Sequence, residues 1–363
     1  RARGGRRCAY RTIAPAAAAS AALTVRNANR RTSEAPTMNR PLHSVLRAFA
    51  ATLLLLLLVG QLASHAVTFK LGTLAPEGST WHKLLQEMGE KWSAASGGKV
   101  KVKIYAGGVA GSEGDMVRKL RVGQLNAAAL SVIGLHDIES SPQALAAPGL
   151  IADEEEWNAV FAEVAPRWEK RFLDKGFVTL AWGDTGWVYL FTRREVKSPA
   201  QMKGLKVFAW AGDPASVEAW RAAGFQPVVL SSTDVLPSLS TGMIDGFTNT
   251  PILAFTARLY EQAKFMYGAR WGRLPAGTIV AKEAWEKVPK ELQPKLLAIA
   301  REVGAKVNTE VGRLQREALE QMRRNGLKEV PLAEADRAAW QRLQEQSWTT
   351  FRATSGDIGA PPE

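Results

Sequence analysis

Two kinds of hydrophobic pattern follow one another along the first part of the chain. Residues 67–74 (VTFKLGTL) and 99–105 (KVKVKIY) alternate between apolar and polar positions, which predicts strands with one buried face. Between them, residues 81–95 place four apolar side chains on one face of a helix: Leu84, Leu85, Met88 and Trp92. Residues 125–132 (LNAAALSV) are apolar enough for a strand buried on both faces, as in a parallel sheet. With a further helix predicted after the glycine-rich segment 107–115, this order of elements indicates an α/β lobe.

A second α/β region follows the first. Residues 153–175 carry apolar side chains at helical spacing, and residues 177–182, 187–193 and 205–210 are short apolar runs of strand length. Residues 278–281 are predicted to return as one more strand. A chain long enough to bury a large core usually divides into more than one compact part, so this alternation predicts a second lobe.

Capping residues mark where two helices of this region begin and end. Asp213 is a favoured N-cap and Pro214 a favoured first-turn residue, so a helix is predicted from there to Gly224. Residues 232–234 offer the next N-cap, and Gly242 is expected to end the short helix that follows.

The last part of the chain is predicted to be helical. Residues 289–325 repeat apolar side chains at intervals of three and four: Leu292, Leu296, Ile299, Val303, Val307, Val311 and Leu314. Residues 333–353 are predicted to form a final helix.

The N-terminal segment has the features of a leader. The sequence begins with an arginine and its first methionine is Met38, so we expect residues 1–37 to be upstream sequence; a transit peptide is the alternative. Residues 38–66 resemble a secretory signal peptide, with basic residues, an apolar run at 48–60 and small residues before a predicted cleavage after Ala66. That run is short for a membrane span, and an uncleaved anchor is the alternative.

This leader changes the interpretation of charge. The whole chain has a net charge of +12, but residues 1–66 hold ten arginines and one acid, which leaves 37 basic and 34 acidic groups in the remainder. A net charge of +3 carries no electrostatic signal for nucleic acid, so no nucleic-acid partner is expected.

Candidate catalytic and metal-binding groups are scarce after residue 66. The single cysteine, Cys8, lies in the leader, and His82 and His136 are the remaining histidines beyond it. A disulfide, a thiol nucleophile, a histidine metal cluster and a Ser-His-Asp triad are therefore poorly supported. Asp184 and Asp245 are the acids expected near a cleft edge, and Asp245 is better explained by turn chemistry. We expect no enzymatic activity, no cofactor and no metal.

Two motifs in residues 198–251 are the most informative features of the sequence. Residues 202–208 read MKGLKVF, and residues 234–249 read DVLPSLSTGMIDGFTN. In their order and separation they resemble motifs of the solute-binding proteins of tripartite ATP-independent periplasmic (TRAP) transporters, the DctP type. The resemblance extends over residues 67–330.

This resemblance implies a fold and a place of action. It implies an α/β, two-lobed periplasmic binding protein with a ligand cleft between the lobes and long C-terminal helices that brace both. We expect residues 67–185 to form mainly lobe I, 186–285 mainly lobe II, and 286–363 the bracing helices. It also implies a periplasmic protein that closes around a small molecule and delivers it to the membrane subunits of a TRAP transporter.

One departure from the family's pattern bears on the ligand. In the family, an arginine fork holds the carboxylate of an organic acid in a bidentate contact. In this sequence that arginine falls on Phe208, and a second family arginine, less securely aligned, falls on Val188. A buried carboxylate without a cationic partner costs several kcal/mol of desolvation. The sequence therefore predicts a largely apolar or aromatic ligand, such as a lipid-like molecule.

The predicted ligand-binding residues combine aromatic side chains with a few polar ones: Trp81, Ser131, Trp182, Trp187, Val188, Phe208, Trp210, Ser232, Asn249 and Trp271. Asn249 matches the family's motif asparagine, and large aromatic side chains gain binding free energy through buried area. For any single aromatic residue, packing in the core is the alternative.

Two other functions remain open at this stage. The ligand is an organic acid if a relocated cation such as Arg193, Arg273 or Lys282 replaces the missing arginine. Alternatively, the protein is a carrier of lipid-like molecules that works with another periplasmic protein instead of a transporter.

Overall fold

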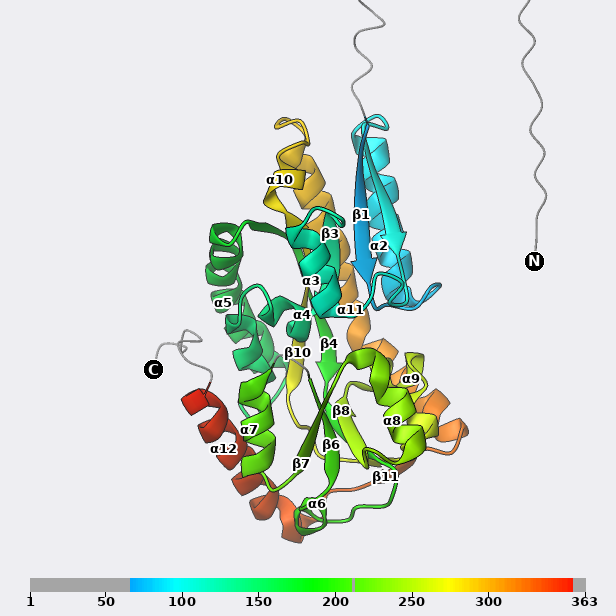
Figure 1. Ribbon diagram of the computed structural model, residues 1–363, viewed down its shortest axis with the longest axis vertical. Helices are drawn as coiled ribbons and strands as arrows, with labels where there is room; N and C mark the ends of the chain where they lie inside the picture. The colour runs from blue at the N-terminus through cyan, green and yellow to red at the C-terminus, as the bar shows by residue number, and fades with distance from the viewer. Residues whose placement is uncertain (1–65, 211–212, 355–363) are drawn as a thin grey trace, which may run out of the picture. The chain divides into compact units, whose positions relative to one another are not determined.

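A computed structural model describes residues 66–210 and 213–354. Most of these residues belong to two β-sheets with helices packed against them (Figure 1). The leader segments predicted at residues 1–37 and 38–66 lie outside the described residues, apart from Ala66. No helix among the described residues is long and apolar enough to cross a membrane.

The first sheet has five strands in the order β2-β1-β3-β10-β4. Its members are β1 (Val67–Thr73), β2 (Val100–Tyr105), β3 (Ala127–Ser131), β4 (Phe177–Trp187) and β10 (Arg273–Ala281). Strands β1, β2 and β3 are parallel, as the apolar run of β3 predicts, whereas β10 runs antiparallel to both β3 and β4. We refer to this sheet and its helices as lobe I.

Helices of lobe I come mainly from the first half of the chain. They are α2 (Thr80–Ala95), α3 (Glu113–Arg121), α4 (Val132–His136), the 3-10 helix η1 (Ser141–Ala146), α5 (Glu154–Asp174) and α10 (Lys282–Trp285). The predicted apolar face of α2 is present: Leu85, Met88 and Trp92 are buried, and Trp92 contacts Phe69 edge to face. Ser79 caps this helix by accepting a hydrogen bond from the backbone N–H of His82.

The second sheet has six strands in the order β11-β9-β5-β8-β6-β7. They are β5 (Tyr189–Thr192), β6 (Lys206–Trp210), β7 (Gln226–Leu230), β8 (Gly246–Asn249), β9 (Phe265–Tyr267) and β11 (Lys328–Val330). The associated short helices are α6 (Pro199–Met202), α7 (Pro214–Ala222), η2 (Ser232–Asp234), α8 (Val235–Thr241), α9 (Pro251–Thr256) and η3 (Leu259–Glu261). This sheet and these helices form lobe II.

The predicted helix ends in lobe II are largely confirmed. The Asp213 side chain accepts from the backbone N–H of Ser216 with Pro214 in the first turn, so α7 begins as predicted. Gly242 ends α8 in the left-handed conformation at φ 78°. Asp234, in contrast, makes no side-chain capping hydrogen bond.

Two extended segments connect the lobes. Strand β4 runs on to Trp187 and is followed at once by β5, whereas its sequence pattern predicts a strand that stops at residue 182. The return segment lies beside it: the N–H of Val188 donates to Gly272 at 2.9 Å, and the N–H of Trp271 donates to Val188 at 2.8 Å. The chain therefore crosses between lobes on a two-stranded connection.

The C-terminal helices contact both lobes. Helix α11 (Gln293–Arg324) packs on α2 and β4 of lobe I and on α9 of lobe II. Helix α12 (Arg337–Thr354), which follows the short 3-10 helix η4 (Glu334–Asp336), packs on α7 of lobe II. Gln315 of α11 donates from Nε2 to the carbonyl of Trp187 at 3.0 Å, so the long helix is also bonded to the connection itself.

Candidate ligand-binding site

A cavity of about 360 Å³ is lined by residues of both lobes and of α11. Lobe I contributes the carboxyl end of β3 and one face of α2; lobe II contributes residues of β6, β8 and α9. Ligand sites of α/β proteins typically form at the ends of strands and the starts of helices, as here. This position makes the cavity the candidate ligand-binding site.

Seven of the ten predicted ligand-binding residues line this cavity: Trp81, Ser131, Trp182, Phe208, Trp210, Ser232 and Asn249. Phe208 and Trp210 lie on the same face of β6, because residues two apart in a strand point the same way, and their rings contact edge to face at 4.7 Å. Ligand contact by these residues stays a prediction, but the structure does bring them together.

Trp182 contributes to the lining differently from the other aromatic residues. Its ring packs edge to face against Phe161, Trp168 and Phe172 of the lobe I core. Its indole Nε1 also donates to the Glu169 carboxylate of α5 at 3.2 Å. The ring is therefore largely committed to contacts within lobe I.

Trp187, Val188 and Trp271 do not line the cavity. All three are buried at the connection between the lobes, where Trp271 stacks on Trp220 at 4.4 Å and the guanidinium of Arg270 lies 4.5 Å from the Trp187 ring. Val188 and Trp271 border a separate small cavity of about 80 Å³. The prediction that these three side chains meet the ligand therefore finds no support in the cavity's geometry.

Neither lysine nor arginine occurs among the described residues that line the cavity. Arg273 is buried, but its guanidinium pairs with Asp184, with Nε donating at 2.8 Å, and lies 5.0 Å from the Trp157 ring. Arg193 and Lys282 are exposed and are not part of the lining. None of the three cations proposed as a replacement for the family arginine reaches the cavity in this structure.

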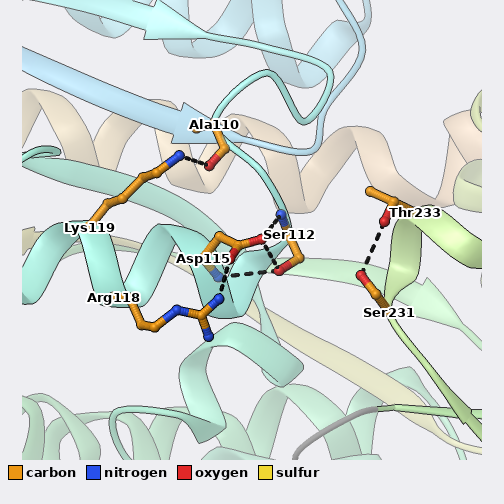
Figure 2. A network of polar contacts seen from close by, with 7 residues as sticks. All are labelled: Ala110, Ser112, Asp115, Arg118, Lys119, Ser231 and Thr233. Atoms are coloured by element: carbon orange, nitrogen blue, oxygen red, sulfur yellow. Dashed lines mark hydrogen bonds and ion pairs between the residues drawn. The ribbon is translucent and has the colours of Figure 1, made fainter.

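Two further cations lie on α3, next to the glycine-rich turn, and both are engaged locally (Figure 2). Lys119 donates from Nζ to the carbonyl of Ala110 at 2.7 Å, and Arg118 pairs with Asp115. Ser112 and Asp115 form a reciprocal capping box at the start of this helix. Because Glu113 and Asp115 occupy its first turn, the helix start is a poor site for an anion, contrary to what a glycine-rich turn before a helix can suggest.

Glu113 is the one charged side chain in the described lining, and no motif or spacing in the sequence singles it out. Its carboxylate accepts hydrogen bonds from the N–H and the hydroxyl of Ser131, both at 2.7 Å, and from the N–H of Gly134 at 2.8 Å. Burial raises the pKa of the Glu113 carboxyl above its usual range, while these hydrogen bonds act in the opposite direction. The described cavity lining thus contains a carboxyl group but neither lysine nor arginine.

Asn249 is the clearest hydrogen-bond donor available to a ligand. Its Oδ1 accepts from the N–H of Thr250 at 2.8 Å, which leaves the two Nδ2 hydrogens without a partner among the described residues. Ser232 and Thr233 lie in the same lining, and Thr233 shares a 3.1 Å hydrogen bond with Ser231 (Figure 2). The polar part of the cavity is therefore small and able to hydrogen-bond a neutral group. In the described chain, no cluster of three or more His, Cys, Asp or Glu residues is arranged to hold a metal ion.

Two α/β lobes around a shared cavity, joined by extended segments and braced by a long helix, define a two-lobed ligand-binding protein. Residues 71–354 match the family described as "Bacterial extracellular solute-binding protein, family 7" (DctP), and the chain belongs to this family. Its motifs at 202–208 and 234–249 lie on α6–β6 and α8–β8, so the motif resemblance and the fold agree.

Relatives of the chain include proteins named as binders of organic acids. It is 26% identical to a solute-binding protein of Roseobacter denitrificans over 67% of this chain and 76% of that protein. It is also 26% identical to the C4-dicarboxylate-binding periplasmic protein DctP of Rhodobacter capsulatus, over 71% of this chain and 77% of that one. A TRAP periplasmic solute-binding protein from Pseudomonas putida F1, solved with D-glucuronate, is similar in fold with a TM-score of 0.74 at 21% identity, over 82% and 98% of the two chains.

Proposed function

We propose that this protein is a periplasmic solute-binding protein that captures a small, largely apolar ligand and delivers it to the membrane subunits of a TRAP transporter. Membership of the solute-binding family supports capture and delivery as its role. The leader predicted at residues 38–66 supports export and cleavage, and with them a periplasmic location. The absence of lysine and arginine from the described lining of the cavity supports an apolar ligand.

The energetic argument rests on what a carboxylate would meet in this cavity. It would lose water, find no cationic partner in the described lining, and lie near the carboxyl group of Glu113. Desolvating an unpaired charge costs several kcal/mol. Phe208, Trp210 and Trp81 instead offer apolar area, which contributes about 25 cal/mol per Å² removed from water.

An organic acid is the second candidate ligand, because the relatives named above include a C4-dicarboxylate-binding protein and a protein solved with D-glucuronate. In this case the donors at Asn249, Ser232 and Thr233 would hold the carboxylate without a cation. A carrier role beside another periplasmic protein is distinguished from transport by the genes adjacent to this one.

The Phe208→Arg variant separates these two ligands. If the cavity has the family's shape but lacks its cation, an arginine at position 208 should create measurable binding of succinate or D-glucuronate, at least tenfold tighter than in the original protein. Isothermal titration of both acids into the original protein and the variant measures this gain. Phe208→Leu is the control, because it removes the ring without adding charge.

Binding of an organic acid by the unaltered protein is the result that would contradict the proposal. If the unaltered protein binds either acid tightly and neither variant binds it more weakly, position 208 does not determine the ligand class. This result would overturn the proposal of an apolar ligand.

A further inference from the structure

The cavity extends away from the contact between the lobes, into lobe I, and the residues around this extension share a pattern. On α2 they are Trp81, Leu84, Leu85 and Met88; on α11 they are Ala300, Val303, Gly304 and Val307. Both sets follow the spacing i, i+3, i+4, i+7, so each is a single stripe along one face of its helix. The two helices pack on each other (Figure 1), and the residues of both stripes line the cavity.

The floor of this extension is made of small side chains in register. Thr278 of β10 pairs with Ala129 on one side and with Ala181 on the other, and the three form a row across neighbouring strands. Two residues earlier in β10, Ala276 pairs in the same way with Ser131 and Gly183. All six residues line the cavity.

This register explains why space remains between sheet and helices. A sheet normally fills the layer beneath packed helices with large aliphatic side chains, and protein interiors leave few voids larger than a water molecule. Here no side chain in the two floor rows is larger than threonine. The backbone of α11 approaches this floor closely at Gly304, where an added Cβ would lie 2.7 Å from the Ala181 Cβ, and the cavity borders the neighbouring positions of both stripes. We refer to this apolar extension, bounded by the two stripes and the two floor rows, as the arm.

The arm is apolar and leads into the core of lobe I. Leu85, Met88, Ala300 and Val303 belong both to the arm and to a buried cluster that continues with Trp92 and Leu296, which are 1% and 0% exposed. Polar groups border the arm at one end: Ser131 of the second floor row donates to the Glu113 carboxylate, and Asn249 of lobe II lies in the same lining.

On the outside of the arm, four charged residues link α2 to α11. Lys91 contacts Glu302 at 2.8 Å and Glu87 at 2.9 Å, and Lys306 contacts Glu87 at 2.5 Å. These pairs join α2 and α11 through partly exposed side chains.

We infer that the ligand is a single-chain amphiphile whose aliphatic chain occupies the arm, while its uncharged polar end accepts a hydrogen bond from Asn249 Nδ2 between the lobes. This inference rests on the proposed function and narrows the ligand class from apolar molecules in general to those with an extended chain. A compact aromatic ligand would fill only the part of the cavity near Phe208 and Trp210.

A chain-length series tests this inference. Isothermal titration of 1-hexanol, 1-octanol, 1-decanol and 1-dodecanol into the protein should show affinity rising about fourfold for each added methylene until the arm is full, and then levelling off. Indole serves as the compact apolar probe, and succinate as the acid probe.

Variants that fill the arm provide the structural control. Ala300→Leu adds bulk to the α11 stripe and should weaken 1-decanol binding at least tenfold while changing 1-hexanol binding by less than about threefold. Ala305→Leu, on an exposed face of the same helix, should leave the whole series unchanged. Ala129→Leu fills the arm from the floor, so the test still holds if one variant fails to fold.

The outcomes separate this inference from the proposed function. Binding of indole with no chain-length dependence, or equal loss for short and long alcohols in Ala300→Leu and Ala129→Leu, would overturn the arm and leave an apolar ligand standing. Tight binding of succinate, with no binding of indole or of any alcohol, would overturn the proposed function itself.

Discussion

Two groups of aromatic side chains lie at the junction of the lobes, and they differ in what they contact. Phe208 and Trp210 line the cavity, whereas Trp220, Trp271 and Trp340 pack on one another beside the connection, with Trp271 between the other two rings. Residue type does not separate the groups, since tryptophan occurs in both. The face of the strand and the neighbouring element decide whether a ring borders the candidate ligand-binding cavity or packs mainly against other aromatic rings.

The contacts of each ring indicate whether it contributes mainly to the stability of the fold or to ligand binding. A ring that packs mainly against other side chains contributes to the free energy of folding, because its removal leaves an empty space. A ring with a cavity on one side contributes to the free energy of binding, because the ligand completes its contacts. Substitutions in the group beside the connection should therefore mainly lower the free energy of unfolding, whereas substitutions in the group that lines the cavity should mainly lower ligand affinity.

The largest effect is expected from Trp271→Ala. This substitution removes a ring that contacts Trp220, Phe225 and Trp340, and should lower the free energy of unfolding by about 3–5 kcal/mol. Urea denaturation measures the loss. The ligand affinity of the remaining folded protein should change by less than about threefold; strong loss of binding with nearly unchanged stability would place Trp271 in the first group.

Trp210→Ala should show the reverse behaviour on a smaller scale. Losing a large aromatic surface in the cavity should weaken binding of the apolar ligand about tenfold or more, and should cost less stability than Trp271→Ala. Titration and urea denaturation of the two variants side by side make the comparison. Equal losses of stability in both would remove the distinction between the groups.

A smaller effect is expected from Glu113 of the cavity lining, which should make the free energy of unfolding depend on pH. Because burial raises its pKa in the folded protein, the stability that Glu113 contributes is fully present below the unfolded value of 4.5 and is lost as pH rises through the folded pKa. The free energy of unfolding of the original protein, measured relative to Glu113→Gln, should therefore fall as pH rises from about 4 and then level off. Urea denaturation of both proteins at a series of pH values checks this sign. A rise over the same range would mean that the donors from Ser131 and Gly134 dominate and lower the pKa instead.

The sequence predicted the fold well where capping and periodicity were strong. The stripe on α2, the start of α7 at Asp213 and the end of α8 at Gly242 follow from local chemistry. Strand β7 was missed, since Pro227 argues against a strand; the structure places it at the edge of the sheet, where a proline is tolerated.

The motifs predicted residues that line the cavity, whereas no sequence signal revealed the contacts between distant segments. Phe208 and Asn249 follow from the family's motifs, but Glu113 faces donors that lie 18 and 21 residues away in the sequence. The arm depends on the register of β3, β10 and β4, which no single segment contains. Leu84, Leu85 and Met88 were correctly placed on one helical face, yet a periodic stripe looks the same whether it meets core or cavity.

The central claim is that the cavity holds an apolar ligand with an aliphatic chain. The most direct measurement is mass spectrometry of whatever remains bound to the natively purified protein after denaturing extraction. The account predicts a lipid-like species with an extended chain and an uncharged polar end. Recovery of a small carboxylate would contradict it, and would show that the donors of Asn249, Ser232 and Thr233, or a cation brought in by closure, hold an organic acid.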